Sequence, residues 1–196
     1  NMIKLARRLW LMEPAAARAD YFERALYNHI LASQEPERSG FVYFTPMRPG
    51  HYRNYSSDTE DFWCCTDTGM ENHAKYGQFI YAHTDRRLWV DLLIPSELDW
   101  TQQGATVRLE TRFPEDGRAT VHFSLKEPRE LEMAVRCPAW LAAGDLRLAV
   151  NGTPQPVDAA PGSYAVVART WRTGDTLTVD WPLRVRTEPL PGSGEW

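Results

Sequence analysis

The stretch Leu88-Trp89-Val90-Asp91-Leu92-Leu93-Ile94, which Pro95 ends, marks the point where the hydrophobic pattern of this chain changes. Before it, apolar residues recur at the three-to-four spacing of helices; after it, they alternate with the period of two that is typical of strands. The 196 residues, 43% of them hydrophobic and 24% charged, have the composition of a folded protein with one large or two small domains. We therefore predict a structural break near residue 85.

Two helices are predicted at the start of the chain. Apolar residues recur at helical spacing from Met2 to Leu9, and Pro14 ends that pattern. Asp20 is a candidate N-cap for a second helix through Tyr21–Ser33, with Glu23 three residues later as its capping-box partner. In this interpretation Glu23 belongs to an exposed first turn.

A long aromatic loop and a third helix complete the first part. Residues 40–63 contain Pro46, Pro49 and Gly50, and Phe41–Phe44 is a short strand candidate. Long loops that carry aromatic and basic side chains are often functional. The third helix is predicted from Thr68 or Met70 to Ala82.

After residue 87, short alternating runs separated by turn signals predict an antiparallel β-sandwich. Besides Leu88–Ile94, the candidate strands are Thr106–Phe113, Ala119–Leu125, Leu131–Arg136, Leu146–Val150, Ser163–Ala168, Thr176–Trp181 and Arg184–Thr187. The intervening turn signals include Asp116-Gly117 and Asn151-Gly152. We expect an α+β chain in which helices precede a sandwich.

Charge and hydropathy argue against two classes of partner. The net charge is −4 and no run of Lys or Arg exceeds two residues, so no nucleic-acid footprint is expected. The apolar runs are too short for a membrane span. The chain opens at Asn1-Met2 without a signal peptide and stops at Trp196 just after a strand-like segment, so we expect a piece of a longer polypeptide, with its compartment left open.

The sharpest local feature is Asp61-Phe62-Trp63-Cys64-Cys65-Thr66-Asp67-Thr68-Gly69. Vicinal cysteines cannot form an ordinary disulfide, so free thiols or metal ligands are expected. A helix start, a nearby cation or a zinc ion would each favour the thiolate. Two buried, inert cysteines are the alternative, because free cysteine is among the most buried residue types. Any metal here needs ligands from elsewhere in the protein.

Three further side chains are weaker candidates. Glu23 could face a ligand pocket instead of capping its helix. Tyr43 and His51 lie in the aromatic loop, where each could contact a ligand or simply pack. Cys137, which precedes Pro138 inside a strand pattern, is predicted to be a small core residue.

Several motifs together resemble the β-L-arabinofuranosidase family, glycoside hydrolase family 127 and its relatives. In the first part they are Tyr21-Phe22-Glu23-Arg24-Ala25-Leu26-Tyr27-Asn28, Phe44-Thr45-Pro46-Met47-Arg48-Pro49-Gly50-His51-Tyr52, Phe62-Trp63-Cys64-Cys65 and Gly69-Met70-Glu71-Asn72-His73-Ala74-Lys75-Tyr76-Gly77. In the second part they are Leu93-Ile94-Pro95-Ser96, Phe113-Pro114, Val150-Asn151-Gly152 and Arg169-Thr170-Trp171-Arg172-Thr173-Gly174-Asp175. The resemblance covers nearly the whole chain in the same order.

This resemblance implies an (α/α)6 barrel that carries the active site, followed by β-sandwich modules. Residues 1–85 would then be the C-terminal, incomplete part of the helical catalytic barrel. Residues 86–196 would form the β-sandwich domain. The implied boundary agrees with the break that the hydrophobic pattern predicts.

The resemblance also implies a retaining glycosidase with an unusual nucleophile. Cys64 would attack the anomeric carbon, and zinc would be held by Cys64, Cys65 and an upstream Glu and Cys. Glu23 and Tyr43 match family residues that contact the sugar. The expected partners are L-arabinofuranose-containing glycans and a second copy in a homodimer, with neither nucleic acid nor a membrane.

Two departures from the family pattern qualify these expectations. The upstream zinc ligands and the acid/base Glu should precede Asn1, so the isolated chain is expected to be inactive and to bind zinc weakly. Asp67 stands where the family has Gly, which puts the substrate preference in doubt. Two other functions stay open: a carbohydrate-binding sandwich that uses Trp89, Trp140, Trp171 or Trp181, and a zinc-thiolate structural or redox protein.

Overall fold

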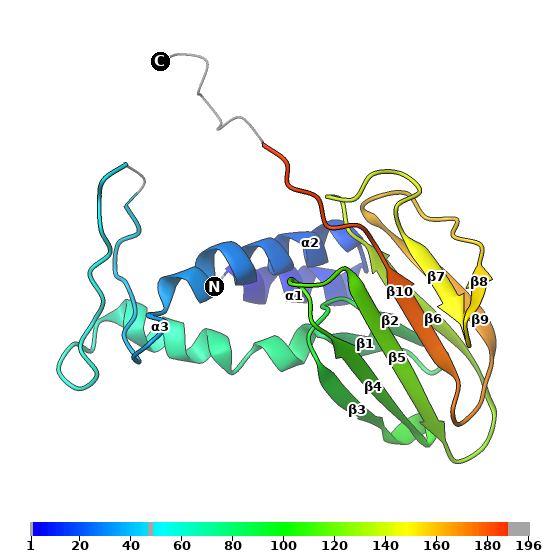
Figure 1. The fold of residues 1–196 in the computed structure, drawn as a ribbon. Coiled ribbons are helices and arrows are strands. Elements are labelled where there is room, and N and C mark those ends of the chain that lie inside the picture. Colours follow the sequence, from blue (N-terminus) through cyan, green and yellow to red (C-terminus); the bar gives the residue numbers. More distant parts are fainter. Residues whose placement is uncertain (1, 47–48, 188–196) are drawn as a thin grey trace.

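The computed structural model describes residues 2–46 and 49–187, and it consists of a helical part followed by two β-sheets (Figure 1). The α-helices are α1 (Met2–Met12), α2 (Ala16–Ala25) and α3 (Cys64–His73). This arrangement confirms the α+β class, whereas the complete (α/α)6 barrel stays a prediction. No described helix has the length and apolar character needed to cross a membrane. Met47 and Arg48 of the loop motif, and the chain end at Gly194–Trp196, lie outside the described residues.

Helix α1 forms where the hydrophobic pattern predicts it, with Ile3, Ala6 and Trp10 on its buried face. Helix α2 begins at Ala16, four residues before the predicted N-cap. It continues through a π-helical turn, Leu26–Ile30, and a 3₁₀ turn, Leu31–Ser33. Helical structure thus reaches Ser33, as expected.

The N-cap prediction for Asp20 is wrong. Asp20 lies inside α2, and its carboxylate accepts hydrogen bonds from the Arg136 guanidinium and from the Ala139 amide at 3.2 Å. These donors belong to the sandwich, more than a hundred residues further along the chain. The Asp20 carboxylate therefore forms a tertiary ion pair instead of the predicted capping box.

The third helix is displaced from its predicted position. Helix α3 begins at Cys64 because Trp63 is extended (ψ 155°) and its carbonyl accepts the Thr66 amide at 2.9 Å. It ends at His73, and a 3₁₀ turn, Tyr76–Phe79, follows. The predicted end of this helix is instead strand β1 (Tyr81–His83), which pairs with β2. Both thiols are therefore in the first turn of α3.

The described strands form a four-stranded and a six-stranded sheet. The four-stranded sheet has the order β1, β2 (Arg87–Val90), β6 (Arg129–Cys137) and β9 (Ser163–Trp171). The six-stranded sheet has the order β3 (Ser96–Trp100), β4 (Ala105–Thr111), β5 (Arg118–Leu125), β10 (Thr176–Asp180), β7 (Arg147–Val150) and β8 (Thr153–Gln155). Trp171 of β9 stacks on Phe123 of β5 at 4.2 Å between centroids, which joins the sheets as a sandwich.

Most predicted strands are confirmed, but the short or polar ones were not foreseen. Strands β1, β3 and β8 escaped prediction. The predicted strand Arg184–Thr187 is wrong: Val185 is fully exposed, and Arg184 pairs with Asp145 at 2.6 Å outside any sheet. Phe41–Phe44 makes only isolated bridges to neighbouring loop residues.

The sandwich is not wholly antiparallel, which corrects the predicted sheet type. Strand β2 pairs in parallel with β6, with Trp89 opposite Ala134, while the other pairings are antiparallel among the described strands. After Val90 the chain crosses to the six-stranded sheet for β3 to β5. It returns for β6 running in the same direction as β2, because a crossover connection of this kind produces parallel neighbours.

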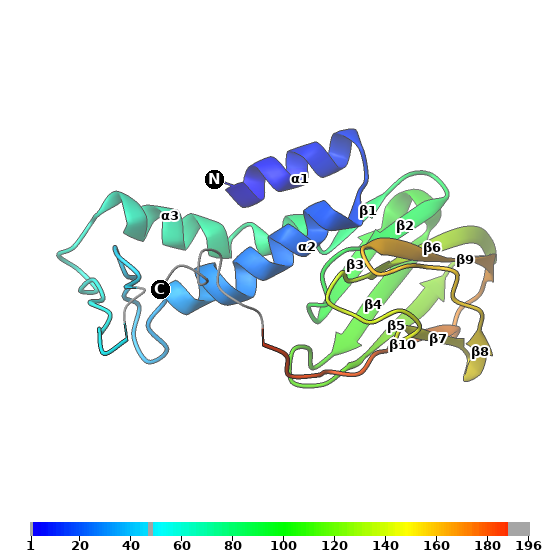
Figure 2. The ribbon, with the colours of Figure 1, turned by 90° about the horizontal axis from the view of Figure 1, so that it is seen from above.

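Helices α1 and α2 pack on the face of the four-stranded sheet that points away from the other sheet (Figure 2). The Trp10 indole of α1 packs edge-on against Trp89 of β2 at 5.5 Å between centroids, and its Nε1 donates to the Tyr164 hydroxyl at 2.8 Å. Phe22 of α2 packs on Phe79 at 4.9 Å between centroids. These contacts fix the helices against the sandwich, while the aromatic loop, residues 40–63, projects from the far end of the helical part (Figure 1).

Candidate functional site

Two thiols begin helix α3 and face a cavity. Cys64 is exposed, Cys65 is partly buried, and their Sγ atoms lie 3.9 Å apart, too far for a disulfide. Their position in the first turn places them near the positive end of the helix dipole. Burial raises the pKa of the Cys65 thiol, and the adjacent Cys64 thiol raises it further. An additional positive charge is therefore needed to hold Cys65 as a thiolate at neutral pH.

The cavity beside these thiols has a volume of about 370 Å³. Its walls include the predicted site residues Tyr43, Cys64 and Cys65. Helix α2 and its π-helical extension supply Tyr21 and His29, which the sequence reasoning did not select. Tyr21, Ala25 and His29 are spaced four residues apart, so helical spacing would have placed all three on the face of the cavity.

Close packing holds the cavity wall in place. The Phe41 ring lies against Gly69 of α3, where an added Cβ would meet the ring Cδ1 at 2.5 Å. The Val42 amide donates to the Ser33 carbonyl at 2.9 Å, and the Phe41 amide donates to Ser56 Oγ at 3.0 Å. The 3₁₀ turn that follows α2, the aromatic loop and α3 are thus joined beside the cavity that Tyr43 and Cys64 line.

Glu23 does not line this cavity. It is 5% exposed, and the Arg136 guanidinium and Trp140 Nε1 each donate to one of its carboxylate oxygens, the latter at 3.0 Å. Arg136 also pairs with Asp20, and its Nε donates to the Asp91 carbonyl at 2.8 Å. We call these residues, Asp20, Glu23, Asp91, Arg136 and Tyr164, the interface network, because they join α2 to the sandwich.

Asp91 is the most unusual member of the interface network. It is completely buried, and the Tyr164 hydroxyl donates to its Oδ1. Its Oδ2 has no hydrogen-bond partner among the described residues. Burial raises the pKa of Asp91 to about 7, against the opposing effects of Tyr164 and Arg136. This carboxyl therefore changes its charge near neutral pH.

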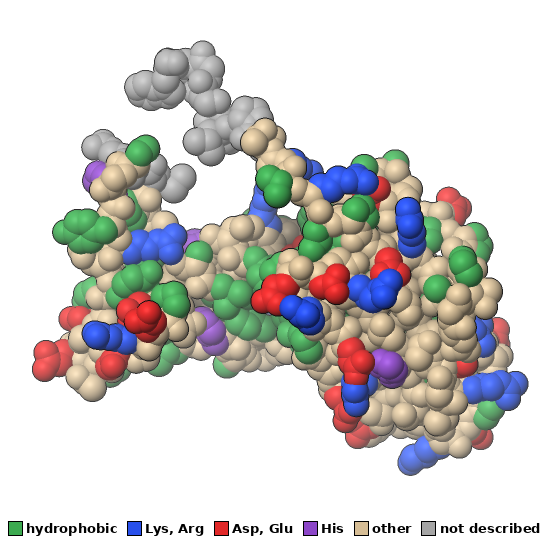
Figure 3. Space-filling model, in the orientation of Figure 1, with side chains coloured by type: hydrophobic (Ala, Val, Ile, Leu, Met, Phe, Trp, Pro, Cys, Tyr) green, Lys and Arg blue, Asp and Glu red, His purple; other side chains and the backbone are tan. Residues whose placement is uncertain are grey.

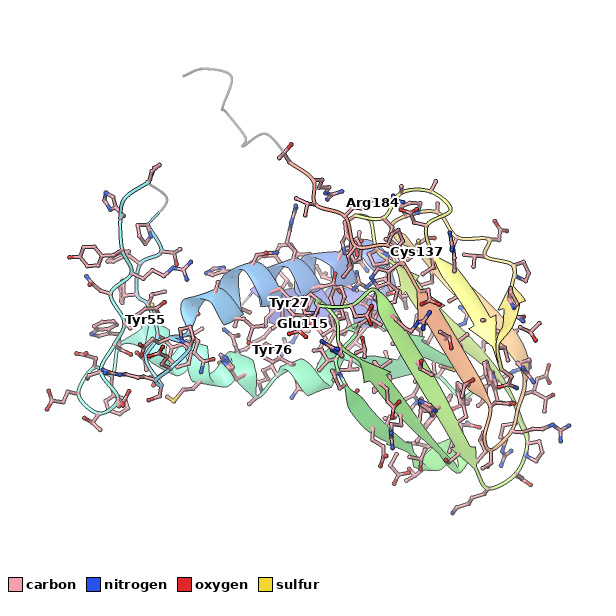
Figure 4. All side chains as sticks on the ribbon, viewed as in Figure 1. Tyr27, Tyr55, Tyr76, Glu115, Cys137 and Arg184 are labelled. Carbon is pink, nitrogen blue, oxygen red and sulfur yellow. The ribbon has the colours of Figure 1, made fainter. Side chains whose placement is uncertain are left out.

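Figure 4 shows that the aromatic loop and the sandwich lie at opposite ends of the molecule. Tyr55 is on the projecting aromatic loop, whereas Tyr27 lies where α2 approaches the sandwich and Cys137 lies within the sandwich. Cys137 is 2% exposed, which confirms it as a core residue. Asp67 is exposed, and it is not among the described residues that line the thiol cavity.

A complete metal site is not formed by the described residues. Within residues 2–46 and 49–187, no three His, Cys, Asp or Glu side chains come together in a group that could hold a metal ion. Among the described residues, Cys64 and Cys65 therefore have no third side chain of these types close enough to form such a group with them. Trp171 and Trp181, two of the four tryptophans proposed for glycan binding, are buried in the core and unavailable to a ligand.

Comparison with solved structures shows a shared fold. A glycoside hydrolase matches with a TM-score of 0.83 and 19% identity, covering 98% of this chain and 34% of that one. A GH127 β-L-arabinofuranosidase from Geobacillus stearothermophilus T6 matches with a TM-score of 0.81 and 22% identity, covering 98% and 32%. A GH127 β-arabinofuranosidase matches with a TM-score of 0.78 and 22% identity, covering 92% and 31%. The chain spans about a third of the length of these structures.

Two family models match consecutive parts of the sequence. The catalytic domain of GH127 β-L-arabinofuranosidases matches residues 1–78, and the middle domain of the same family matches residues 87–183. No curated protein matches the chain. The order of the two matches is that of the helical part and the sandwich, and the chain therefore belongs to the β-L-arabinofuranosidase family, glycoside hydrolase family 127.

Proposed function

We propose that the full-length protein containing this chain is a retaining glycosidase that releases β-L-arabinofuranose and uses Cys64 as its nucleophile. The observation that carries the proposal is the position of Cys64: an exposed thiol in the first turn of α3, on the wall of a cavity of about 370 Å³. Membership of glycoside hydrolase family 127 supports the reaction class. The substrate sugar follows from the family resemblance.

We further propose that zinc is held by Cys64 and Cys65 together with ligands from outside this chain. Two thiolate ligands of a tetrahedral zinc ion lie about 3.8 Å apart, given Zn–S bonds of about 2.3 Å. The separation of 3.9 Å between the two Sγ atoms fits that requirement without rearrangement. Bound zinc would supply the positive charge that keeps both sulfurs deprotonated at neutral pH.

The chemistry of Cys64 then takes two steps. Its thiolate attacks C1 of the arabinofuranose while the C1–O bond breaks, and the departing oxygen takes a proton from an acid outside this chain. Water next attacks C1 of the thioglycoside, gives up its proton to the same group, and the Cys64 thiolate leaves. The two displacements at C1 retain its configuration.

Other residues of the cavity would position the sugar. Tyr43, which borders the same cavity, is proposed to contact the sugar ring, and the side chains of Tyr21 and His29 would contribute to the rest of the wall. The sugar contact of Glu23 stays a prediction. Both of its carboxylate oxygens already accept hydrogen bonds, one from Arg136 and one from Trp140. The (α/α)6 barrel, and its boundary with the sandwich at residues 85 and 86, are likewise part of the proposal.

The test compares two cysteines in the full-length protein. Hydrolysis of an aryl β-L-arabinofuranoside is measured for wild type, Cys64→Ala and the core variant Cys137→Ala, with zinc content determined for each. Loss of a nucleophile lowers kcat by about a thousandfold or more. We expect that loss for Cys64→Ala and near wild-type turnover for Cys137→Ala. Wild-type turnover by Cys64→Ala would refute the nucleophile, and full zinc content without any hydrolysis in wild type would favour a structural zinc-thiolate protein.

A further inference from the structure

A second cavity lies where the helical part meets the sandwich, and the proposed reaction does not use it. Its volume is about 740 Å³, within the range of roughly 300–1,000 Å³ that is common for small-molecule sites. The π-helical turn after α2 supplies Tyr27 and Asn28 to its wall, and loops of the sandwich supply Phe113 and Trp140. We call it the junction cavity. Of its described wall residues, only Tyr21 also lines the thiol cavity, so the two cavities are separate sites.

Three aromatic rings form the apolar part of the junction cavity. The rings of Phe113 and Trp140 are nearly parallel, with 10° between their planes and 6.1 Å between their centroids, and Tyr27 packs edge-on against Phe113 at 5.6 Å. All three side chains are half-buried. Figure 3 shows hydrophobic side chains gathered on the surface where the helical part meets the sandwich. Rings held by such contacts offer apolar surface that a ligand can cover without first ordering it.

The Tyr27 hydroxyl is a polar group without a partner at this cavity. None of the residues that the structure describes forms a hydrogen bond with it, although the side chain is half-buried. Burial and the nearby Glu23 carboxylate raise the pKa of Tyr27, so the hydroxyl keeps its proton at neutral pH and can donate it to a ligand. Asn28, which is exposed, adds an amide to the same wall.

The carboxylates of the junction cavity are already bonded within the protein. All four carboxylate oxygens of Asp20 and Glu23 accept a hydrogen bond, two of them from the buried Arg136 guanidinium. This pairing balances their charge and argues against a cationic ligand or a metal ion. Arg24 and Arg186 also line the cavity, and a guanidinium group has five donors, which hydrogen-bond with neutral oxygens as well as with anions.

A sugar residue matches this combination of groups. Its C–H faces pack on aromatic rings, and its hydroxyl groups hydrogen-bond with phenol, amide and guanidinium groups. A purely apolar ligand would cover the Tyr27 hydroxyl and leave it without a partner, which costs binding free energy.

We propose that the junction cavity is a second carbohydrate site, which binds a sugar residue of a glycan chain and does not cleave it. Neither Cys64 nor Cys65 is among its described wall residues, so the proposed nucleophile does not reach the bound sugar. Two sites on one protein raise the effective concentration of a polymeric ligand, so binding here would hold the enzyme on its substrate between cleavage events. That the glycan contains L-arabinofuranose rests on the proposed function, whereas the cavity itself does not.

The test measures how strongly the full-length protein binds arabinan, a polymer of L-arabinofuranose, from its retardation in gels that contain the polymer. Tyr27→Phe removes only the hydroxyl, and Phe113→Leu removes the flat ring but keeps an apolar side chain. We expect each variant to raise the Kd for arabinan by about three- to tenfold, the effect of losing one hydrogen bond or one aromatic contact. The value of kcat/KM for an aryl β-L-arabinofuranoside, whose hydrolysis needs only the thiol cavity, should stay at that of wild type.

Tyr76→Phe is the matched control for Tyr27→Phe. The Tyr76 hydroxyl also lacks a hydrogen-bond partner among the described residues, but Tyr76 does not belong to the described wall of the junction cavity. An unchanged Kd for Tyr27→Phe, or an equal rise for Tyr76→Phe, would overturn the proposal. An equal loss of kcat/KM for the aryl substrate in Tyr27→Phe would also overturn it, because the cavity would then be part of the catalytic pocket.

The alternative occupant of the junction cavity is another part of a longer chain. In that case Phe113→Leu would lower the melting temperature and leave the Kd for arabinan unchanged, which would overturn the proposal.

The failure of the proposed function would be visible separately. If Cys64→Ala still hydrolyses the aryl substrate while Tyr27→Phe weakens arabinan binding, the nucleophile is refuted and the junction cavity stands. If Cys64→Ala is inactive and arabinan binding does not depend on Tyr27, only the junction cavity is refuted.

Discussion

The interface network and the thiol cavity both use reactive side chains from the helical part, but in opposite ways. Glu23 is buried, and each of its oxygens has a partner, 113 and 117 residues further along the chain. Cys64 is exposed on a cavity wall, and its nearest sulfur belongs to the adjacent residue. In the interface network, both carboxylate oxygens of Glu23 accept hydrogen bonds that hold α2 to the sandwich. The second arrangement leaves its thiols on the wall of a cavity, with Cys64 exposed.

The largest effect should come from breaking the interface network at its centre. Arg136→Met would leave the buried Glu23 carboxylate and the partly buried Asp20 carboxylate without their cation, and removal of one partner from a buried ion pair costs about 3–5 kcal/mol. We expect a loss of this size in the free energy of unfolding of the 196-residue chain, measured by urea denaturation.

Two controls sharpen the Arg136 experiment. The triple variant Asp20→Asn, Glu23→Gln, Arg136→Met removes every charge of the ion pairs and should recover much of the lost stability. Arg112→Ala breaks the exposed pair with Glu115, whose side chains are 77% and 72% exposed, and should cost less than about 1 kcal/mol. Equal losses for Arg136→Met and Arg112→Ala would contradict the role of the interface network.

The next effect is a pH dependence of the free energy of unfolding, and it comes from Asp91. Because its pKa in the folded state is about 7, above the ordinary 3.8, the folded state binds a proton that the unfolded state has released. This contribution to stability is full below about pH 4 and is lost as pH rises through 7, by at most about 4 kcal/mol.

Asp91→Asn removes this titration and tests it directly. The free energy of unfolding is measured for wild type and Asp91→Asn from pH 4 to pH 8. We expect the variant to gain stability relative to wild type as pH rises, with the difference levelling off above pH 7. A difference that does not change with pH would show that Asp91 titrates normally.

A smaller effect should come from disturbing the wall of the thiol cavity. Gly69→Ala would bring a Cβ to 2.5 Å from the Phe41 ring, and overpacking of this kind costs about 1–3 kcal/mol. Gly77→Ala is the matched control, since nothing lies within 4 Å of a Cβ there. Thermal unfolding should separate the two variants, and the same melting temperature for both would contradict the contact between Phe41 and α3.

The break near residue 85, helix α1 and the longer strands could be predicted from the sequence because hydrophobic periodicity reports burial on one face. Strand β8 could not, because it is three residues long and contains Pro154. The sequence predicts the start of α3 at Thr68 or Met70, and the true start at Cys64 is not marked because Trp63 has no capping side chain. Local signals predict elements well where packing agrees with them.

The residues of the candidate site also differ in how well the sequence predicts their positions. Cys64, Cys65 and Tyr43 could be selected from their motifs, and they do line one cavity. Glu23 was selected by the same reasoning, yet its position depends on Arg136, which no local pattern connects to it. His29 could have been found by extending the spacing from Tyr21, whereas the π-helical turn that carries it leaves no sequence signature.

The most direct measurement would look for the covalent intermediate on Cys64. The full-length protein is mixed with an arabinofuranoside that carries an activated aryl leaving group, quenched in acid during turnover, digested and examined by mass spectrometry. An activated leaving group makes formation of the thioglycoside fast and its hydrolysis the slow step. The account predicts one anhydropentose on Cys64 and none on Cys65 or Cys137. Turnover with the sugar attached to a different residue, or with Cys64 unmodified throughout, would contradict it.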